Sequence, residues 1–202
     1  YTHFMEKEIY EQPDALGNTI NGRLGEHDVL DNIFGLGSSD AFKNVKRIQF
    51  VACGTSLHAA KTARKWFEDI CEIPCYIDFA SEYRYRNPIV EDHTLFVTIS
   101  QSGETADTLA ALEYARAEKY VGIVTICNVP TSTMARNADW KIFTNAGPEI
   151  GVASTKAFTT QLAALLMLAL SIAKSQDKNA KKRKQATQEL RETPALVDQA
   201  FS

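Results

Sequence analysis

The stretch "TLFVTISQSGETADTLAALEYA", residues 94–115, joins a β-branched apolar run directly to a segment of helical period. The junction, from Ser100 to Thr105, is made of hydroxyl, amide, acidic and glycine residues. A continuous apolar run is typical of a strand that is covered on both faces, as strands of parallel sheets are. The stretch therefore predicts a strand, a polar turn and a helix in immediate succession.

The same alternation continues on both sides of this stretch. Segments of helical period, at 56–70, 81–86, 104–119 and 131–138, separate five apolar runs that we expect to be strands: "RIQFVAC" (47–53), "PCYIDF" (74–79), "TLFVTIS" (94–100), "VGIVTIC" (121–127) and "DWKIFTN" (139–145). Repeated βαβ units have right-handed crossovers, which place helices on both faces of the sheet. The predicted class is α/β, a three-layer α/β/α sandwich with a five-stranded parallel sheet.

Three parts are expected along the chain. Residues 1–45 form an N-terminal helical segment, in which helix over 3–24 is either kinked by Pro13 or restarted there. Residues 46–176 form the α/β domain, which ends in a long apolar helix over 154–175. Residues 177–202 form a polar connection and a last amphipathic helix, with the basic cluster Lys181–Lys184 on a solvated surface. The first residue is not methionine, and we expect a piece of a longer polypeptide.

Composition excludes several classes of function. A formal charge of -3 disfavours a nucleic-acid binder, and the apolar run at 161–174 is shorter than the roughly 20 residues of a membrane span. The four cysteines lack the paired spacing of a zinc site, and the four histidines lack metal-ligand spacing. We expect a cytoplasmic protein with reduced cysteines that pack in the interior, and with no bound metal.

Two strand ends carry the polar turns that could bind a ligand. In open α/β sheets, ligands bind beyond the carboxyl ends of the strands, where loops lead into helix N-termini. The first strand ends in "ACGTS", in which Gly54 permits a tight turn and Thr55 or Ser56 could cap the next helix. Two such turns at neighbouring strands would converge on one crevice.

The turn after the third strand suits a small anion. Free N–H groups at a helix start attract negative charge, and the hydroxyls of Ser100, Ser102 and Thr105 and the amide of Gln101 can donate to a phosphate. The motifs of nucleoside triphosphate and dinucleotide sites, GxxxxGK[ST] and GxGxxG, are absent. The pattern therefore favours a phosphomonoester, although Ser102 could instead serve only as the helix cap.

Other polar residues leave alternatives open. In "NAGPEIGVASTKAFTT" (145–160), Ser154 or Thr155 is a natural helix cap, and Lys156 either faces an anion or a carboxylate such as Glu149 or is solvated. Glu104 is either a general base or an acidic residue of the first helical turn.

Two arginines in "SEYRYR" also have several possible partners. Arg84 and Arg86 could pair with Glu82 or Glu104, or could lie at a subunit contact.

Five motifs in order resemble one enzyme family. "ACGTS", "SEYRYR", "SQSGETADTLAAL", "ICNVPTSTMAR" and "NAGPEIGVASTKAFTTQL" are similar to the isomerase part of the glutamine–fructose-6-phosphate aminotransferases, also called glucosamine-6-phosphate synthases. The similarity covers nearly the whole chain and corresponds to the first of two sugar isomerase (SIS) subdomains. It implies a flavodoxin-like SIS fold that binds a carbohydrate derivative.

The resemblance also implies a set of substrate contacts. Ser100, Gln101, Ser102 and Thr105 would grip the phosphate of fructose 6-phosphate. Thr55 and Ser56 would contact the sugar, and Val152 and Ser154 would line the side of the sugar hydroxyls. No metal or organic cofactor is implied.

Activity and partners follow from the same resemblance. The family makes glucosamine 6-phosphate from fructose 6-phosphate and glutamine for amino-sugar synthesis, as a transferase and isomerase. Its glutaminase domain, second SIS domain and catalytic side chains lie elsewhere in the family's chain, so we assign no catalytic residue here. We expect a homodimer and an isolated chain without turnover. The alternatives are a stand-alone SIS phosphosugar isomerase, a phosphosugar-sensing regulatory module, or a lobe that chiefly makes a dimer interface.

Overall fold

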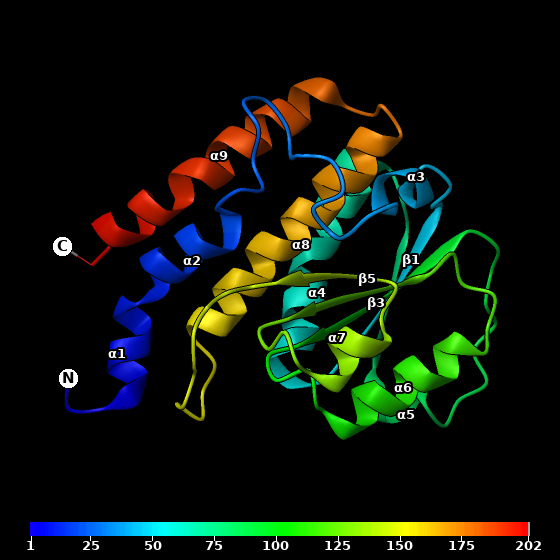
Figure 1. The fold of residues 1–202 in the computed structure, drawn as a ribbon, viewed down its shortest axis with the longest axis horizontal. Helices are drawn as coiled ribbons and strands as arrows, with labels where there is room; N and C mark the ends of the chain where they lie inside the picture. The colour runs from blue at the N-terminus through cyan, green and yellow to red at the C-terminus, as the bar shows by residue number, and fades with distance from the viewer. Residues whose placement is uncertain (202) are drawn as a thin grey trace.

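The computed structural model describes residues 1–201 and contains the predicted five-stranded parallel sheet (Figure 1). The strand order is β2-β1-β3-β4-β5, so the chain reverses direction across the sheet between β1 and β3. The bounds are β1 Arg47–Ala52, β2 Cys75–Phe79, β3 Thr94–Ser100, β4 Ile123–Cys127 and β5 Trp140–Phe143. The predicted fold class is confirmed. β3 has the predicted bounds, and the other strands are shorter than predicted.

Helices cover both faces of the sheet (Figure 1). One face packs against α4 (Gly54–Trp66), the π-helical turn η1 (Phe67–Cys71) and α8 (Lys156–Ser175). The other packs against three shorter helices: α5 (Ala80–Tyr83), α6 (Ala106–Arg116) and α7 (Thr133–Asn137). The short α3 (Ser38–Phe42) contacts α8.

Alternation along the strands divides the interior into two apolar clusters. Phe50 and Val97 belong to the cluster under α4 and α8, whereas their neighbours Val51 and Phe96 belong to the cluster under α5, α6 and α7. Successive side chains of a strand point to opposite faces, so a strand in the middle of a three-layer sandwich is buried on both faces. All seven residues of β3 are buried, as this requires.

The helix α8 is the central helix of the larger cluster. By length and composition alone it could cross a membrane, but 78% of its most apolar window is buried within the molecule. Its burial makes it a core helix, as the sequence predicts.

The N-terminal and C-terminal helices pack together outside α8 (Figure 1). α1 (Phe4–Tyr10) ends before α2 (Gln12–Ile20), and Pro13 lies in the first turn of α2, so it restarts the helix. α9 (Ala180–Gln199) contains the whole basic cluster. The predicted solvated surface is wrong for Arg183, which is only 7% exposed and donates to Asp28 at 2.8 Å. Residue 202, the end of the predicted segment 177–202, lies outside the described residues.

Candidate functional site

A cavity of ≈ 290 Å³ opens at the carboxyl ends of β1 and β3. This is the point where the strand order reverses, and open α/β sheets bind ligands there. All eight predicted site residues line the cavity, together with five others: Cys53, Thr55, Ser56, Ile99, Ser100, Gln101, Ser102, Thr105, Glu149, Gly151, Val152, Ser154 and Gln161. The topology therefore brings together three segments that are far apart in the sequence.

The turn after β3 is organised by its own hydroxyl groups. Ser100 Oγ accepts from the N–H of Gly103 at 3.0 Å and shares a hydrogen bond with Thr105 Oγ1 at 2.9 Å. Ser102 Oγ accepts from the N–H of Glu104 at 3.1 Å. The helix α6 starts later than predicted, at Ala106, with Thr105 in the N-cap position and no side-chain cap. The alternative role of Ser102 as helix cap is therefore wrong, because its hydroxyl closes the turn ahead of the helix.

The turn after β1 also differs from the prediction in detail. Cys53 is the N-cap residue of α4, and Thr55 and Ser56 lie inside its first turn. Neither of them caps the helix, contrary to the prediction. Cys53 is partly buried, and its Sγ accepts a hydrogen bond from Thr108 Oγ1 at 3.9 Å. The other three cysteines are buried, and all four are free thiols, as predicted.

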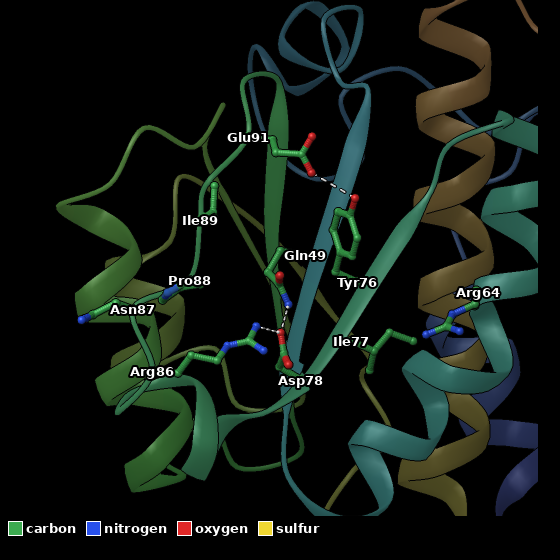
Figure 2. Close-up of a pocket in the computed structure, with 10 residues that line it drawn as sticks. All are labelled: Gln49, Arg64, Tyr76, Ile77, Asp78, Arg86, Asn87, Pro88, Ile89 and Glu91. Carbon is green, nitrogen blue, oxygen red and sulfur yellow. Dashed lines mark hydrogen bonds and ion pairs between the residues drawn. The ribbon is translucent and has the colours of Figure 1, made fainter.

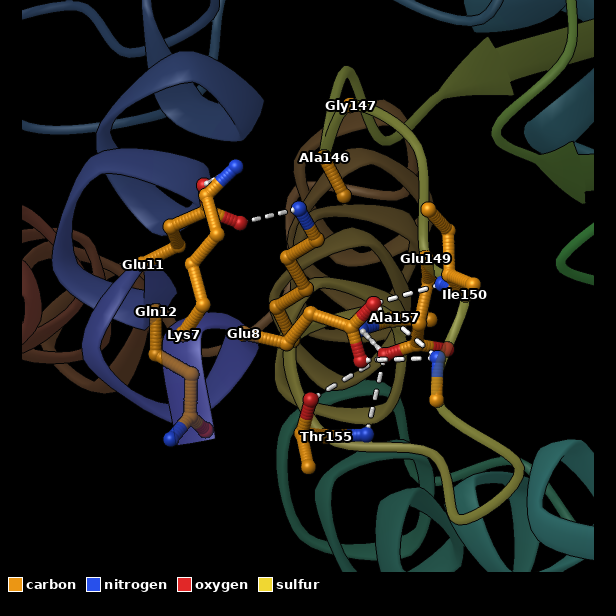
Figure 3. A network of polar contacts seen from close by, with 12 residues as sticks. Lys7, Glu8, Glu11, Gln12, Ala146, Gly147, Glu149, Ile150, Thr155 and Ala157 are labelled. Carbon is orange, nitrogen blue, oxygen red and sulfur yellow. Dashed lines mark hydrogen bonds and ion pairs between the residues drawn. The ribbon is translucent and has the colours of Figure 1, made fainter. Parts of the chain in front are cut away.

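The loop before α8 is held by a carboxylate that the sequence did not assign to this task. Glu149 accepts hydrogen bonds from the N–H groups of Thr155 and Ala157, at 2.9 and 3.1 Å, and from the hydroxyl of Ser154 at 3.3 Å (Figure 3). A carboxylate at the start of a helix satisfies N–H groups that have no partner within the helix. Glu149 thus does the capping that we expected from Ser154 or Thr155.

Lys156 is buried and paired rather than solvated. It is 3% exposed, and its Nζ lies 2.6 Å from Glu11 Oε2 (Figure 3). The alternative that Lys156 faces a carboxylate is therefore confirmed, but the partner is Glu11 and not Glu149. The hydrogen bond from Lys156 lowers the pKa of Glu11, with a smaller contribution from Lys7. This ion pair ties the start of α8 to the junction of α1 and α2.

Glu104 does not line the cavity. Its Oε1 accepts from the N–H of Thr133 at 2.6 Å, and this hydrogen bond lowers the pKa of the carboxyl. Glu104 precedes α6 and serves the N-terminus of α7, so the predicted place in the first turn of α6 is wrong and no contact supports a general base.

The two arginines of "SEYRYR" pair with aspartates that we had not named. Arg84 lies 2.9 Å from Asp107 on α6, and Arg86 lies 2.7 Å from Asp78 on β2. Both predicted partners, Glu82 and Glu104, are therefore wrong.

A larger cavity of ≈ 610 Å³ lies at the β2 edge of the sheet (Figure 2). Its charged groups are largely satisfied by one another, since Asp78 binds Arg86 and Gln49, and Glu91 accepts from Tyr76 at 3.0 Å. No residue of the "SQSGET" or "CGTS" turns lines this cavity. The smaller cavity is therefore the better candidate site.

Gln161 is the lining residue that sequence reasoning missed most clearly. It is 3% exposed, and its Oε1 is buried without a hydrogen-bond partner. The available signal was a polar amide directly before the apolar run 162–170 of α8. Among residues 1–201, no cluster of His, Cys, Asp or Glu could hold a metal ion.

Comparison with known proteins agrees with this geometry. The SIS domain family matches residues 41–171. A glutamine–fructose-6-phosphate aminotransferase from Idiomarina loihiensis is 51% identical over 100% of this chain and 33% of its own length. Another, from Pseudomonas syringae pv. tomato, is 55% identical over 85% of this chain and 28% of its own. The chain thus spans about a third of the length of these relatives.

Solved structures point the same way. The C-terminal domain of glucosamine-fructose-6-phosphate aminotransferase from Francisella tularensis superposes with a TM-score of 0.93 and 48% identity, over 97% of this chain and 55% of that one. A phosphosugar isomerase structure from Silicibacter pomeroyi has a TM-score of 0.81 at 23% identity, over 98% of this chain and 56% of that one, which shows the shared fold. The resemblance seen in the sequence motifs is confirmed. The chain belongs to the SIS domain family.

Proposed function

We propose that this chain is the fructose-6-phosphate-binding lobe of a glutamine–fructose-6-phosphate aminotransferase. The observation that carries the proposal is the meeting of three polar segments, after β1, after β3 and before α8, around one cavity at the switch point of the sheet. Relatives bearing that name are similar to the chain over its whole length.

The phosphate would lie against the turn after β3. Hydroxyl groups of Ser100, Ser102 and Thr105 and the amide of Gln101 surround that end of the cavity. The lining residues include no lysine, arginine or histidine, so an anion would be held by dipoles and hydrogen-bond donors rather than by a fixed positive charge. This chemistry fits a monoester better than a polyphosphate.

The sugar would extend towards the other two segments. Thr55 and Ser56 lie in the first turn of α4, and Ser154 and Val152 lie on the loop before α8, with the side chain of Val152 fully exposed. Hydroxyl groups on this side match the hydroxyls of a hexose. We propose glucosamine 6-phosphate as the second ligand of the same cavity and no metal or organic cofactor.

The partners in this proposal are other parts of the same enzyme. A second SIS domain and a glutaminase domain would supply the catalytic groups and the ammonia, a second copy of the chain would complete a homodimer, and the assembly would work in the cytoplasm. Nothing in the charge pattern suggests nucleic acid, since the formal charge is -3.

Calorimetric titration with fructose 6-phosphate tests the phosphate assignment. Ser102→Ala and Thr105→Ala are each expected to weaken binding by roughly 10-fold or more, because a hydrogen bond to a charged group contributes about 1.5–3 kcal/mol. Ser81→Ala, which changes an exposed serine of α5, is the matched control and should bind as the wild type does. Wild-type affinity in Ser102→Ala and Thr105→Ala would contradict the phosphate assignment, and no binding by the wild type would contradict the function.

A further inference from the structure

We propose that Glu8 of α1 is a positioning residue for the sugar end of the site, an inference that rests on the function proposed above. Glu8 holds the middle of the loop 147–154, which we call the covering loop. Through this contact the N-terminal helix would set how well the cavity binds a sugar, while leaving the grip on the phosphate unchanged.

The contact joins residues that are far apart in the sequence. Glu8 Oε1 accepts from the N–H of Ile150 at 2.5 Å and from the N–H of Gly151 at 3.0 Å, and Oε2 lies 3.2 Å from the same Gly151 nitrogen (Figure 3). Glu8 is 2% exposed. A buried carboxylate is costly unless such donors compensate it, so the covering loop and Glu8 stabilise each other.

The geometry at Gly151 shows how close the approach is. A Cβ added there would lie 2.5 Å from Glu8 Oε2 and 3.5 Å from the Cα of Met5. The covering loop therefore lies directly on α1, and a side chain at this position would push the two apart.

Both ends of the covering loop are fixed by other groups. On one side, Asn128 Nδ2 donates to the carbonyl of Gly147 at 2.7 Å. On the other side, the N–H groups of Thr155 and Ala157 at the start of α8 donate to Glu149. Glu8 acts between these anchors, on Ile150 and on Gly151, the second of which lines the cavity.

The consequence for binding is confined to one end of the cavity. Gly151, Val152 and Ser154 of the covering loop line the cavity together with the turn after β3. The hydrogen bonds that shape that turn, between Ser100 and Gly103 and between Ser102 and Glu104, involve no residue of α1. Loss of Glu8 should therefore make the covering loop less ordered at the sugar end of the cavity, and should leave the turn after β3 at the phosphate end unchanged.

α1 also lies outside residues 41–171, which match the SIS domain family. A displacement of α1 would reach the covering loop through Glu8. The contact is thus suited to adjust sugar affinity from outside the α/β domain.

A comparison of two ligands distinguishes an effect at the sugar end of the cavity from an effect at the phosphate end. Calorimetry with fructose 6-phosphate and with inorganic phosphate should be run on the wild type, Glu8→Ala, Glu8→Gln and the control Glu6→Gln, which changes an exposed residue of the same helix. Glu8→Ala is expected to lower the affinity for fructose 6-phosphate by about 10-fold, which corresponds to one charge-assisted hydrogen bond. The affinity for inorganic phosphate should not change. Glu8→Gln should fall between Glu8→Ala and the wild type, and Glu6→Gln should match the wild type.

Amide hydrogen exchange without ligand tests the contact itself. The N–H groups of Ile150 and Gly151 should exchange faster in both Glu8 variants, whereas the N–H of Thr133, which donates to Glu104, should not change. Wild-type affinity for fructose 6-phosphate in Glu8→Ala would overturn this inference and leave the proposed function standing. A wild type that binds inorganic phosphate but not fructose 6-phosphate would overturn both.

Discussion

Gly103→Ala is expected to lower the free energy of unfolding by about 2–5 kcal/mol, which combines the penalty of a left-handed backbone with that of overpacking. Gly103 has φ +66°, a conformation that side chains rarely adopt. A Cβ there would lie 2.3 Å from Ser132 Oγ and 2.5 Å from Ser132 Cβ. Ser132 cannot easily move, because it is 1% exposed and its hydroxyl caps α7 through the N–H of Ala135.

Urea unfolding followed by circular dichroism measures this loss. The matched control is Gly17→Ala, in the interior of α2, where an added Cβ has no neighbour within 4 Å. That substitution should stabilise the chain by about 0.5–1 kcal/mol, since alanine is the better helix former. Similar unfolding midpoints for Gly103→Ala and the wild type would show that the turn tolerates a side chain, against the geometry described above.

Glu11→Gln should be the most destabilising single change at the α1–α8 junction, and should lower the free energy of unfolding by about 1–3 kcal/mol. It leaves the ammonium of Lys156 buried without its carboxylate, since the side chain of Lys156 is 4% exposed. Lys156→Met should cost less, because Glu11 is 33% exposed and keeps Lys7 at 3.2 Å. The double variant should be more stable than Glu11→Gln alone, because it removes the stranded charge. A double variant at or below the stability of Glu11→Gln would contradict this account.

The same ion pair should shape the response to acid. Lys156 lowers the pKa of Glu11 below its usual 4.5. The charged form of Glu11 is therefore more stable in the folded chain than in the unfolded chain. Its stabilisation is complete above about pH 4.5 and is lost as the pH falls through the folded pKa. The free energy of unfolding should therefore fall more steeply below pH 4.5 in the wild type than in Lys156→Met, which urea titrations at successive pH values can check.

The fold could be predicted because the sheet is buried on both faces. Burial of β3 leaves a continuous apolar run, and the polar turn that follows it marks the strand end without ambiguity. The boundaries of helices were less predictable. At the start of α6, hydroxyl groups bond within the turn and delay the helix to Ala106, a competition between side chain and backbone that spacing alone does not reveal.

The site could be predicted where its residues adjoin strand ends, and not where they depend on distant partners. The polar turns after β1 and β3 can be recognised from their composition. Because the two strands are neighbours at the switch point, their turns lie at the same cavity. Glu8, by contrast, bonds a residue 142 positions away, and Glu11 and Lys156 are 145 positions apart. Local patterns contain no information on such pairs, so the sequence did not decide between a paired and a solvated Lys156 and did not indicate Glu11 as its partner.

The unequal apolar clusters on the two faces of the sheet imply unequal resistance to opening. The cluster under α4 and α8 includes most of the twenty-residue helix α8, whereas α5 and α7 have only four and five residues. Short helices over a small core open at lower free energy than long buried ones. The face with α5, α6 and α7 should therefore be the first cooperative unit to unfold, and a ligand at the end of β3, which stabilises the start of α6, would slow the fluctuations of that unit most.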